Sequence, residues 1–577
     1  MRRYASIDFL RGMAIVLMLF LHIAHDLVDM DFLMNNLNNI PSINVLTLVM
    51  MSFLGGLAGL FLIVSAIGNM ISIMRFLQAG KPVKDLIIRQ VAGGVLLLIF
   101  AVLSEGVIGY HGAFGEIFNN LNNIPDYMAN SFIPNLSKSG FRFETIHTIA
   151  WCIILNGIVQ GILVKLYGFE QHKKIIKAYI ILAIAVLVAT PFIWEGLFQA
   201  LGPGFPYGES PFGNGEPDIR YASFVEIITV FFANVLAGRP EPCFPYLAAS
   251  FFGSIIGIVL SLPREKIPRN FPKKVLQIGF VMFLVGIVGV VVNIALMMEY
   301  NPSGALELYA RLSDHRIWVN NAMVASDNPM EPVFAGIPSY LPVLGWLFQF
   351  LMLNGVSLAA IMTIVRLVEF RGNGKNFAAK TTFIRRFGFV AFTIYTIQFV
   401  YFIVKFIITS VFYGQPYDPM DWGGTFIAMF LAYAMFHLIM IAWEKANYIG
   451  SIEWMIGTIA AYVIPGRKKE VPWYRKGELD VKNAFYEAEW LNVVEKDEIQ
   501  HDKMEESKLA YYFSGWGFLF PPLSMVCLAL SKKAEKQEKV NKFNKGAKIT
   551  SIIGIVFLIT WVTLMSILSL SDVGIAL

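Results

Sequence analysis

The chain has 577 residues, of which 56% are hydrophobic and only 15% are charged. A soluble protein of this length needs more charge to cover its surface, so the composition excludes the soluble globular class. The net charge of +5 is small for this length and does not indicate binding to nucleic acid. Repeated apolar runs longer than about 18 residues instead predict an all-α, polytopic membrane helix bundle.

About ten apolar segments in one main domain have the length of a membrane-spanning helix. Their predicted ranges are 6–29, 46–74, 87–109, 145–167, 174–197, 244–262, 274–299, 338–366, 385–413 and 424–445. The first is too long and too polar for a cleaved signal peptide, so we expect it to be retained. The loop 197–220 is predicted to lie outside and the loop 263–273 inside, so an odd number of crossings must separate them. Segment 244–262 supplies one crossing, and the shorter stretch 221–238 is therefore expected to lie along the outer surface or to re-enter.

Lysine and arginine residues between the predicted spans set the predicted orientation. They precede the first span and gather in alternate links, whereas residues 30–45 contain none. These residues are Arg2, Arg3, Arg75, Lys81, Lys84, Lys173, Lys174, Lys177, Arg264, Lys266, Arg269, Lys273, Lys274, Arg366, Arg371, Lys375, Lys380, Arg385 and Arg386. The positive-inside rule therefore predicts a multi-pass protein of the cell membrane with a cytoplasmic N-terminus.

The C-terminal part of the chain is predicted to be a separate module. The predicted domains are 1–465 for the main bundle, 466–508 for a charged cytosolic linker and 509–577 for the C-terminal module. This module contains a pair of hydrophobic segments, 509–531 and 548–570. Lysines between these segments, together with Pro521 and Pro522 inside the first, favour a helical hairpin that returns to the cytoplasm.

Ionisable residues follow one face of the first predicted helix. Arg11 and His22 are eleven residues apart, which is about three turns and roughly 16 Å along the axis. Asp8 lies three residues before Arg11 and Asp26 four residues after His22, so we expect each to pair on that face. A polar stripe of this kind must face protein or water. The alternative reading is structural, with an Asp8–Arg11 ion pair and a helix–helix hydrogen bond from His22.

The other predicted spans separate two kinds of charged residue. Histidines and carboxylates gather at the predicted outer side: Glu105, His111, Glu144 and His147, with Tyr110 next to His111. Cations gather at the predicted inner side: Arg75, Lys84 and Arg89. The cations suit an anionic, phosphate-bearing donor, and a histidine beside a carboxylate can take a proton from a hydroxyl or amine. No metal is expected, because His22 and His25 lack the HExxH pattern and no Cys/His cluster surrounds them.

The stretch SIDFLRGMAIVLMLFLH resembles the opening of the transmembrane acyltransferase superfamily. This superfamily includes the acyltransferase-3 family, the heparan-alpha-glucosaminide N-acetyltransferase family and YeiB-like bacterial relatives. The acyltransferase-3 pattern of Arg, ten residues and His matches Arg11 and His22. Similar stretches follow in order: ETIHTIAWCIILNGI, GRPEPCFPYLAASFFGSIIG, RRFGFVAFTIYTIQFVYF and YIGSIEWMIGTIAAYVIP. The resemblance covers residues 1–465.

The resemblance implies an enzyme that moves an acyl group, expected to be acetyl, from cytoplasmic acyl-CoA to an extracytoplasmic glycan, lipid or small-molecule acceptor. It implies that His22 is catalytic and that Arg11 is its motif partner. Asp26, Glu105 and His147 are the candidates to orient His22. Residues 30–45 contain no histidine, so a covalent acetyl-histidine there is not expected, and direct transfer assisted by His22 is the simpler route.

The same resemblance implies that Arg89 holds the CoA donor, with Arg75 and Lys84 as neighbours. KDLIIR spaces Lys84 and Arg89 differently from the RxxR pair of the acyltransferase-3 family. Expected partners are membrane lipid and a glycan or lipid-linked acceptor, with a homodimer among the open oligomeric states. The rival hypothesis is a proton-coupled transporter or flippase, in which the same stripe relays protons. A non-catalytic membrane scaffold is a third reading, which leaves the stripe unexplained.

Overall fold

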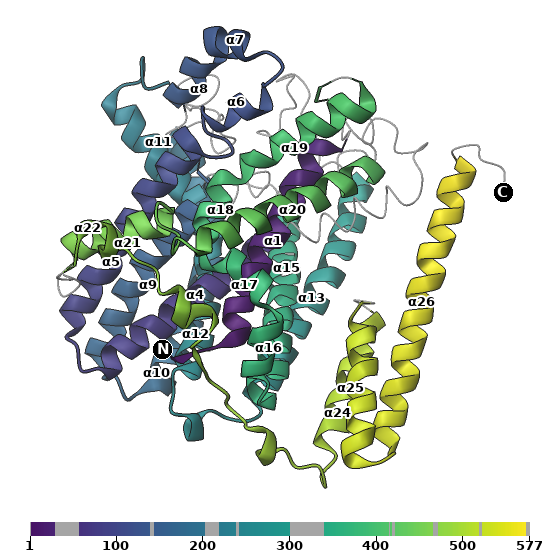
Figure 1. Ribbon diagram of the computed structural model, residues 1–577. Coiled ribbons are helices and arrows are strands. Elements are labelled where there is room, and N and C mark those ends of the chain that lie inside the picture. The colour runs from purple at the N-terminus through teal and green to yellow at the C-terminus, as the bar shows by residue number, and fades with distance from the viewer. Residues whose placement is uncertain are drawn as a thin grey trace. The chain divides into compact units, whose positions relative to one another are not determined.

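The computed structural model describes residues 2–28, 57–138, 143–201, 218–237, 242–300, 340–414, 416–417, 422–464, 471–518 and 522–572. Within these ranges the protein is almost entirely helical (Figure 1). Two short strands, β1 (Arg2–Arg3) and β2 (Glu489–Trp490), pair in parallel. The chain divides into two compact units: unit 1 is 1–28, 52–366 and 374–491, and unit 2 is 29–51, 367–373 and 492–577.

Ten helical segments in the described ranges are long and apolar enough to cross a membrane. Nine of these crossings lie in α1 (Ala5–Leu27), α4 (Leu57–Gln78), α5 (Val83–Leu103), α9 (Thr145–Tyr167), α10 (His172–Leu201), α12 (Cys243–Leu260), α13 (Phe271–Tyr300), α15 (Tyr340–Val368) and α20 (Trp422–Glu444). The tenth is the segment Ala391–Phe412. Each segment overlaps one predicted span, so the predicted all-α polytopic helix bundle is confirmed. Residues 46–56 of the second predicted span lie outside the described residues.

Shorter helices connect and cover these segments. In unit 1 they are η1 (Ser104–Ile108), α6 (Gly115–Asn119), α7 (Ile124–Asp126), η2 (Tyr127–Ser131), α8 (Phe132–Lys138), α11 (Phe224–Ala237), η4 (Arg264–Lys266), α16 (Gly374–Lys380), α17 (Thr382–Phe389), α21 (Ile452–Val463), α22 (Trp473–Lys476) and α23 (Val481–Phe485). The helix α11 has 14 residues and is about 21 Å long, shorter than the hydrocarbon core of about 30 Å. It is therefore too short for a straight crossing.

The first helix, α1, is packed within unit 1 against α4, α16, α17 and α20 (Figure 1). Close approach to α17 depends on two glycines. A Cβ placed on Gly12 would lie 2.1 Å from the carbonyl oxygen of Ile384, and one on Gly388 would lie 2.5 Å from the backbone nitrogen of Gly12. Small residues let helix backbones approach in this way in membrane bundles. The polar face of α1 is thereby held against protein.

The predicted span 385–413 is not one continuous helix. Helix α17 ends at Phe389, and Val390 leaves the helical region with φ −118° and ψ 48°. The chain then forms α18 (Ala391–Ile397), a 3-10 turn η6 (Gln398–Val400), α19 (Tyr401–Ile408) and a π turn η7 (Thr409–Tyr413). The carboxylate of Glu453 caps the start of α18 by accepting from the backbone N–H of Phe392 at 2.7 Å. This cap explains why a new helix begins there.

Part of the predicted linker packs within unit 1. Residues 471–491 belong to this unit, and the backbone N–H of Leu491 donates to the carbonyl of Arg3 at 2.8 Å. The buried guanidinium of Arg385 donates to the carbonyl of Ala484 at 2.5 Å and lies 4.4 Å from the ring centre of Trp490. These contacts tie this stretch to the N-terminal end of the bundle.

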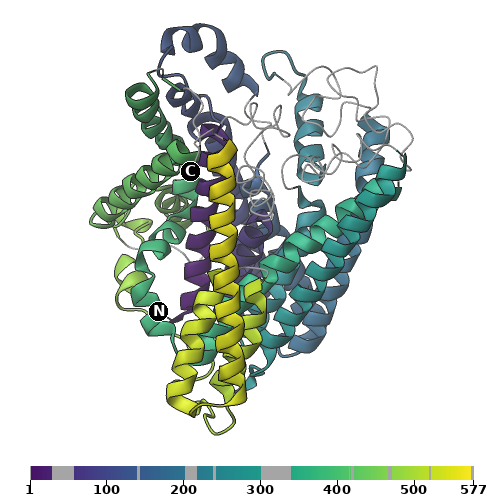
Figure 2. The ribbon, with the colours of Figure 1, turned by 90° about the vertical axis from the view of Figure 1, so that its right-hand side faces the viewer.

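Unit 2 contains a group of three helices that run side by side (Figure 2). They are α24 (Glu505–Ser514), α25 (Pro522–Glu538) and α26 (Lys542–Asp572), and the chain reverses between each pair. Glu538 accepts from the backbone N–H groups of Glu506 at 2.7 Å and Ser507 at 2.9 Å. It therefore caps the first turn of α24 from the end of α25. The unit also contains the 3-10 turns η5 (Glu369–Arg371), η8 (Lys496–Glu498) and η9 (Gly515–Phe518).

Candidate functional site

The side chain of His22 meets the interrupted span where the 3-10 turn η6 begins. Its Nδ1 lies 2.8 Å from Oε1 of Gln398. An amide oxygen only accepts, so Nδ1 carries the hydrogen and Nε2 carries the lone pair of a neutral ring. Within the described ranges, no hydrogen bond joins Nε2 to another residue. The structure thus presents a half-buried imidazole whose basic nitrogen is Nε2.

Asp26 is a predicted orienting partner of His22, but its carboxylate contacts other residues in the described part of the chain. Its Oδ2 accepts hydrogen bonds from the hydroxyls of Tyr110 and Tyr401, and its Oδ1 lies 3.2 Å from Nδ1 of His25. Its backbone carbonyl also accepts from Nζ of Lys405 at 2.6 Å. The carboxylate therefore anchors the end of α1 to two other segments of the bundle.

Tyr110 links the Asp26 group to the His22 ring. Its ring stacks on that of His22 with centroids 5.0 Å apart and an interplanar angle of 17°. Burial, followed by the negative charge of Asp26, raises the pKa of the Tyr110 hydroxyl well above its usual value. The phenol consequently stays protonated and donates to Asp26, which holds its ring against His22.

Three further ionisable side chains converge beside His22. Glu105, His111 and Glu144 place one ligand atom each within 4.8 Å of the others. Nε2 of His111 lies 3.7 Å from Oε1 of Glu144, and the His111 ring centre is 6.5 Å from that of His22. Glu105, predicted as an orienting residue, thus belongs to a neighbouring cluster and is only 1% exposed.

His147, also predicted to orient His22, has a local role. Glu144 is the N-cap of α9, and its backbone N–H donates to Nδ1 of His147 at 3.1 Å, in a reciprocal capping box. The His147 ring also stacks on Phe143 with centroids 5.1 Å apart. These contacts hold Glu144 and His147 together at the start of the helix.

Asp8 acts on the guanidinium of Arg11 through its charge, but its direct ion pair is with another residue. Asp8 is instead held by Arg3, whose Nε and second terminal nitrogen lie 2.7 and 2.9 Å from its two oxygens. Arg11 lines a small hollow with Arg3, Asp8 and Arg385. Arg3 precedes the helix, and its guanidinium contacts both oxygens of the Asp8 carboxylate. This bidentate geometry is a strong form of ion pair.

The three predicted donor-binding cations lie at the same end of the bundle as Arg11. Arg75 is half-buried in the last turn of α4, and its main charged neighbours include Arg2, Arg3 and Asp8. The guanidinium of Arg89 lies 5.4 Å from the ring centre of Phe76, and Lys84 is exposed near the start of α5. Arg75 thus lies in the last turn of α4, and Arg89 packs against that turn through Phe76.

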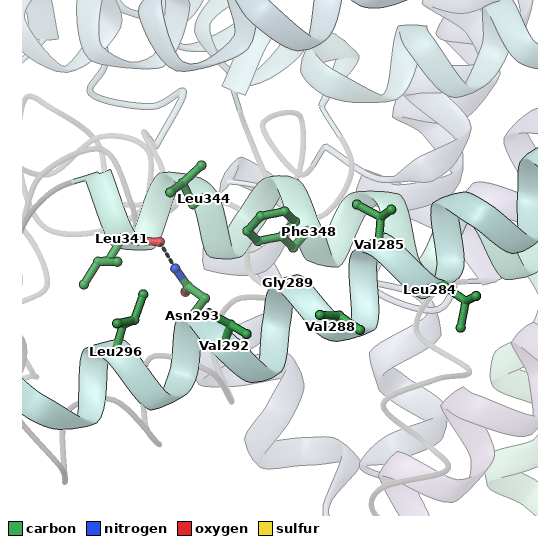
Figure 3. Close-up of a pocket in the computed structure, with 10 residues that line it drawn as sticks. All are labelled: Leu284, Val285, Val288, Gly289, Val292, Asn293, Leu296, Leu341, Leu344 and Phe348. Carbon is green, nitrogen blue, oxygen red and sulfur yellow. Dashed lines mark hydrogen bonds between the residues drawn. The ribbon is translucent and has the colours of Figure 1, made fainter.

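A separate apolar groove of about 620 Å³ lies between α13 and α15 (Figure 3). It is lined by Leu284, Val285, Val288, Gly289, Val292, Asn293, Leu296, Leu341, Leu344 and Phe348. The amide of Asn293 donates to the carbonyl of Leu341 at 2.8 Å across the groove. None of the predicted site residues lines it, so the polar site and this groove are distinct features.

Sequence reasoning missed three residues of the site: Gln398, Tyr401 and Lys405. Their spacing of three and four residues is helical, and all three are polar positions inside an apolar segment. That pattern was visible in TIYTIQFVYFIVK, but it does not say which other helix the residues face.

No protein-family model and no curated protein matches this chain. The likeness to the transmembrane acyltransferase superfamily therefore stays a prediction from the quoted motifs.

Proposed function

We propose that the protein is a membrane acyltransferase that moves an acyl group, expected to be acetyl, from acyl-CoA to an acceptor hydroxyl or amine. The observation that supports this most is the Nδ1–Oε1 contact of 2.8 Å between His22 and Gln398. This contact selects the ring tautomer in which Nε2 is a base. A positioned histidine base is the usual means of activating a hydroxyl or amine nucleophile.

The proposed reaction is a direct transfer. Nε2 of His22 takes the proton of the acceptor O–H or N–H as the acceptor atom attacks the thioester carbonyl. A new ester or amide bond forms, the carbon–sulfur bond breaks, and the CoA thiolate takes the proton back from His22. Gln398 keeps the ring oriented throughout, because its amide oxygen accepts from Nδ1–H in both protonation states.

The donor is proposed to enter from the opposite end of the bundle. Arg75, Arg89 and Lys84 are proposed to attract its phosphates, together with Arg11, which lines a small hollow with Arg3 and Arg385. Arg11 and His22 are separated by about 16 Å along α1, a distance for the pantetheine arm to follow. In this proposal the N-terminal end faces the cytoplasm of the cell, and the acceptor is an extracytoplasmic glycan, lipid or small metabolite.

The test is a binding and transfer assay on the purified full-length protein. Acetyl-CoA is expected to raise the thermal unfolding temperature, because it binds the folded state alone. Reconstituted protein supplied with labelled acetyl-CoA on one side and a mixed glycan and lipid pool on the other should yield a product heavier by one acetyl group. Neither stabilisation nor labelled product with acetyl-CoA and longer acyl-CoAs would overturn the proposal.

One observation favours the rival, a proton-coupled transporter or flippase. The segment that carries Gln398 and Tyr401 is interrupted beside a row of ionisable residues, and interrupted helices line the binding sites of many transporters. A pH gradient across a proteoliposome separates the two functions. Substrate movement that follows the gradient, with no change in covalent mass, would identify the transporter.

A further inference from the structure

Three side chains beside His22 have the geometry of a metal site. They are Glu105, His111 and Glu144, whose ligand atoms all lie within 4.8 Å of one another. Ligand atoms around one Zn²⁺ are about 3.4 Å apart, given bonds of about 2.0–2.1 Å in a tetrahedral arrangement. The His111–Glu144 distance of 3.7 Å already approaches that value. Small rotations of the side chains would bring all three atoms onto one ion.

The backbone holds the three residues in place from separate segments. Glu105 lies in the π turn η1 that follows α5, and π turns of this kind occur often at functional sites. The N–H of Gly109 ends η1 by donating to the carbonyl of Ser104 at 2.6 Å, and the N–H of Gly112 donates to the carbonyl of Gly109 at 2.9 Å in the turn that follows. His111 comes from that turn, and Glu144 from the capped start of α9. The cluster is thus built by tertiary structure rather than by one flexible loop.

Electrostatics favours a cation at this place. Two ionised carboxylates so close together repel one another, and Glu105 is almost fully buried, where that repulsion is poorly screened. A bound divalent ion would relieve that repulsion. The imidazole of His111 would be the third ligand. Zn²⁺ binds imidazole well, whereas Mg²⁺ prefers oxygen ligands.

We propose that Glu105, His111 and Glu144 bind a Zn²⁺ ion. Three protein ligands are the number typical of zinc sites that keep a position open for water or a substrate oxygen. The His111 ring centre lies 4.3 Å from that of Tyr110 and 6.5 Å from that of His22, so the ion is held beside the imidazole base. This proposal does not depend on acyl transfer and applies equally to a transporter.

The test is the metal content of the full-length protein, purified in detergent without chelators. Elemental analysis is expected to find about one zinc per chain, and Zn²⁺ added after chelation should raise the unfolding temperature. His111→Ala and Glu144→Gln should each weaken Zn²⁺ binding by more than about tenfold, since loss of even an outer partner typically costs that much. His172→Ala, at the start of α10, is the matched control and should keep its zinc.

The half-buried ligands His111 and Glu144 carry the test, because substitution of the buried Glu105 endangers folding. Size-exclusion profiles identical to wild type show that the variants are folded. Wild-type protein that contains no zinc and gains no stability from added Zn²⁺ would overturn the proposal, as would unchanged zinc in both folded variants. Acyl transfer is measured separately, so failure of one proposal does not imply failure of the other.

Discussion

The two ends of α1 carry ionisable residues in similar number, but they satisfy them in different ways. At the N-terminal end, Asp8 is held by a bidentate ion pair with Arg3. At the C-terminal end, Asp26 is held mainly by two tyrosine hydroxyls, and His22 by an amide oxygen. The Asp8 carboxylate thus has one bidentate arginine partner, whereas the Asp26 carboxylate contacts two tyrosine hydroxyls and, at 3.2 Å, the imidazole of His25. The first end therefore contains the bidentate ion pair, and the second carries the imidazole that the proposed reaction uses as its base.

The two ends of α1 have different tasks in the proposed function: the first fixes the start of the helix, and the second holds the base. An ion pair between partly buried groups holds the helix start in one place but leaves no group free to change protonation. A base must accept and return a proton, so its orienting partner has to tolerate both states. Gln398 meets that demand for His22 because its amide does not titrate near neutral pH.

The largest effect is expected for His22→Ala. Removal of the base should lower the rate of acyl transfer by about 10²- to 10⁴-fold, the usual contribution of general base catalysis. His172→Ala, which removes a histidine far along the chain from this site, should leave the rate within about twofold. Transfer rates from labelled acetyl-CoA measure both. A His22→Ala variant with wild-type transfer would remove the functional difference between the two ends.

A smaller effect is expected for Gln398. Gln398→Ala should lower transfer by about tenfold to a hundredfold, because the ring loses the acceptor that sets its tautomer and orientation. Gln398→Glu keeps an oxygen acceptor at the same place but adds a titratable charge, so it should recover part of the rate. Equal losses in the two variants, with unchanged unfolding temperatures, would show that the contact does not orient the base.

The two aspartates of α1 should differ in their effect on stability. Asp8→Asn breaks a bidentate ion pair whose side chains are only 15–19% exposed, so it should cost about 1.5–3 kcal/mol. Asp26→Asn keeps an oxygen that accepts from Tyr110 and Tyr401, and should cost about 1 kcal/mol or less. Denaturant unfolding in detergent measures both. A larger loss for Asp26→Asn would reverse the assignment of the structural role.

The smallest effects are expected among the cations proposed to hold the donor. Arg89→Ala should weaken acetyl-CoA binding by about fivefold, which corresponds to about 1 kcal/mol for one phosphate contact. Lys84→Ala, at an exposed position, should change it by less than about twofold. Calorimetric titration with acetyl-CoA distinguishes these values. If Lys84→Ala weakened acetyl-CoA binding more than Arg89→Ala, the donor phosphates would not bind beside Arg89.

Most of the fold was open to prediction because each membrane crossing is a local property. A span needs about 20 apolar residues whatever its neighbours are, so hydropathy alone located all ten segments. The break at Val390 was not predicted, because the cap that starts α18 comes from Glu453, about sixty residues away. Apolar patterning does not record such a distant partner.

The candidate site also has a part that local sequence predicts and a part that depends on distant residues. Helical spacing by itself determined that Arg11 and His22 share a face of α1 and that this face needs protein or water against it. Only the tertiary structure decided the partners: Arg3 for Asp8, Gln398 for His22, and the meeting of Glu105 with Glu144. The physical reason is that periodicity follows from one helix alone, whereas a hydrogen bond between helices depends on how several helices pack.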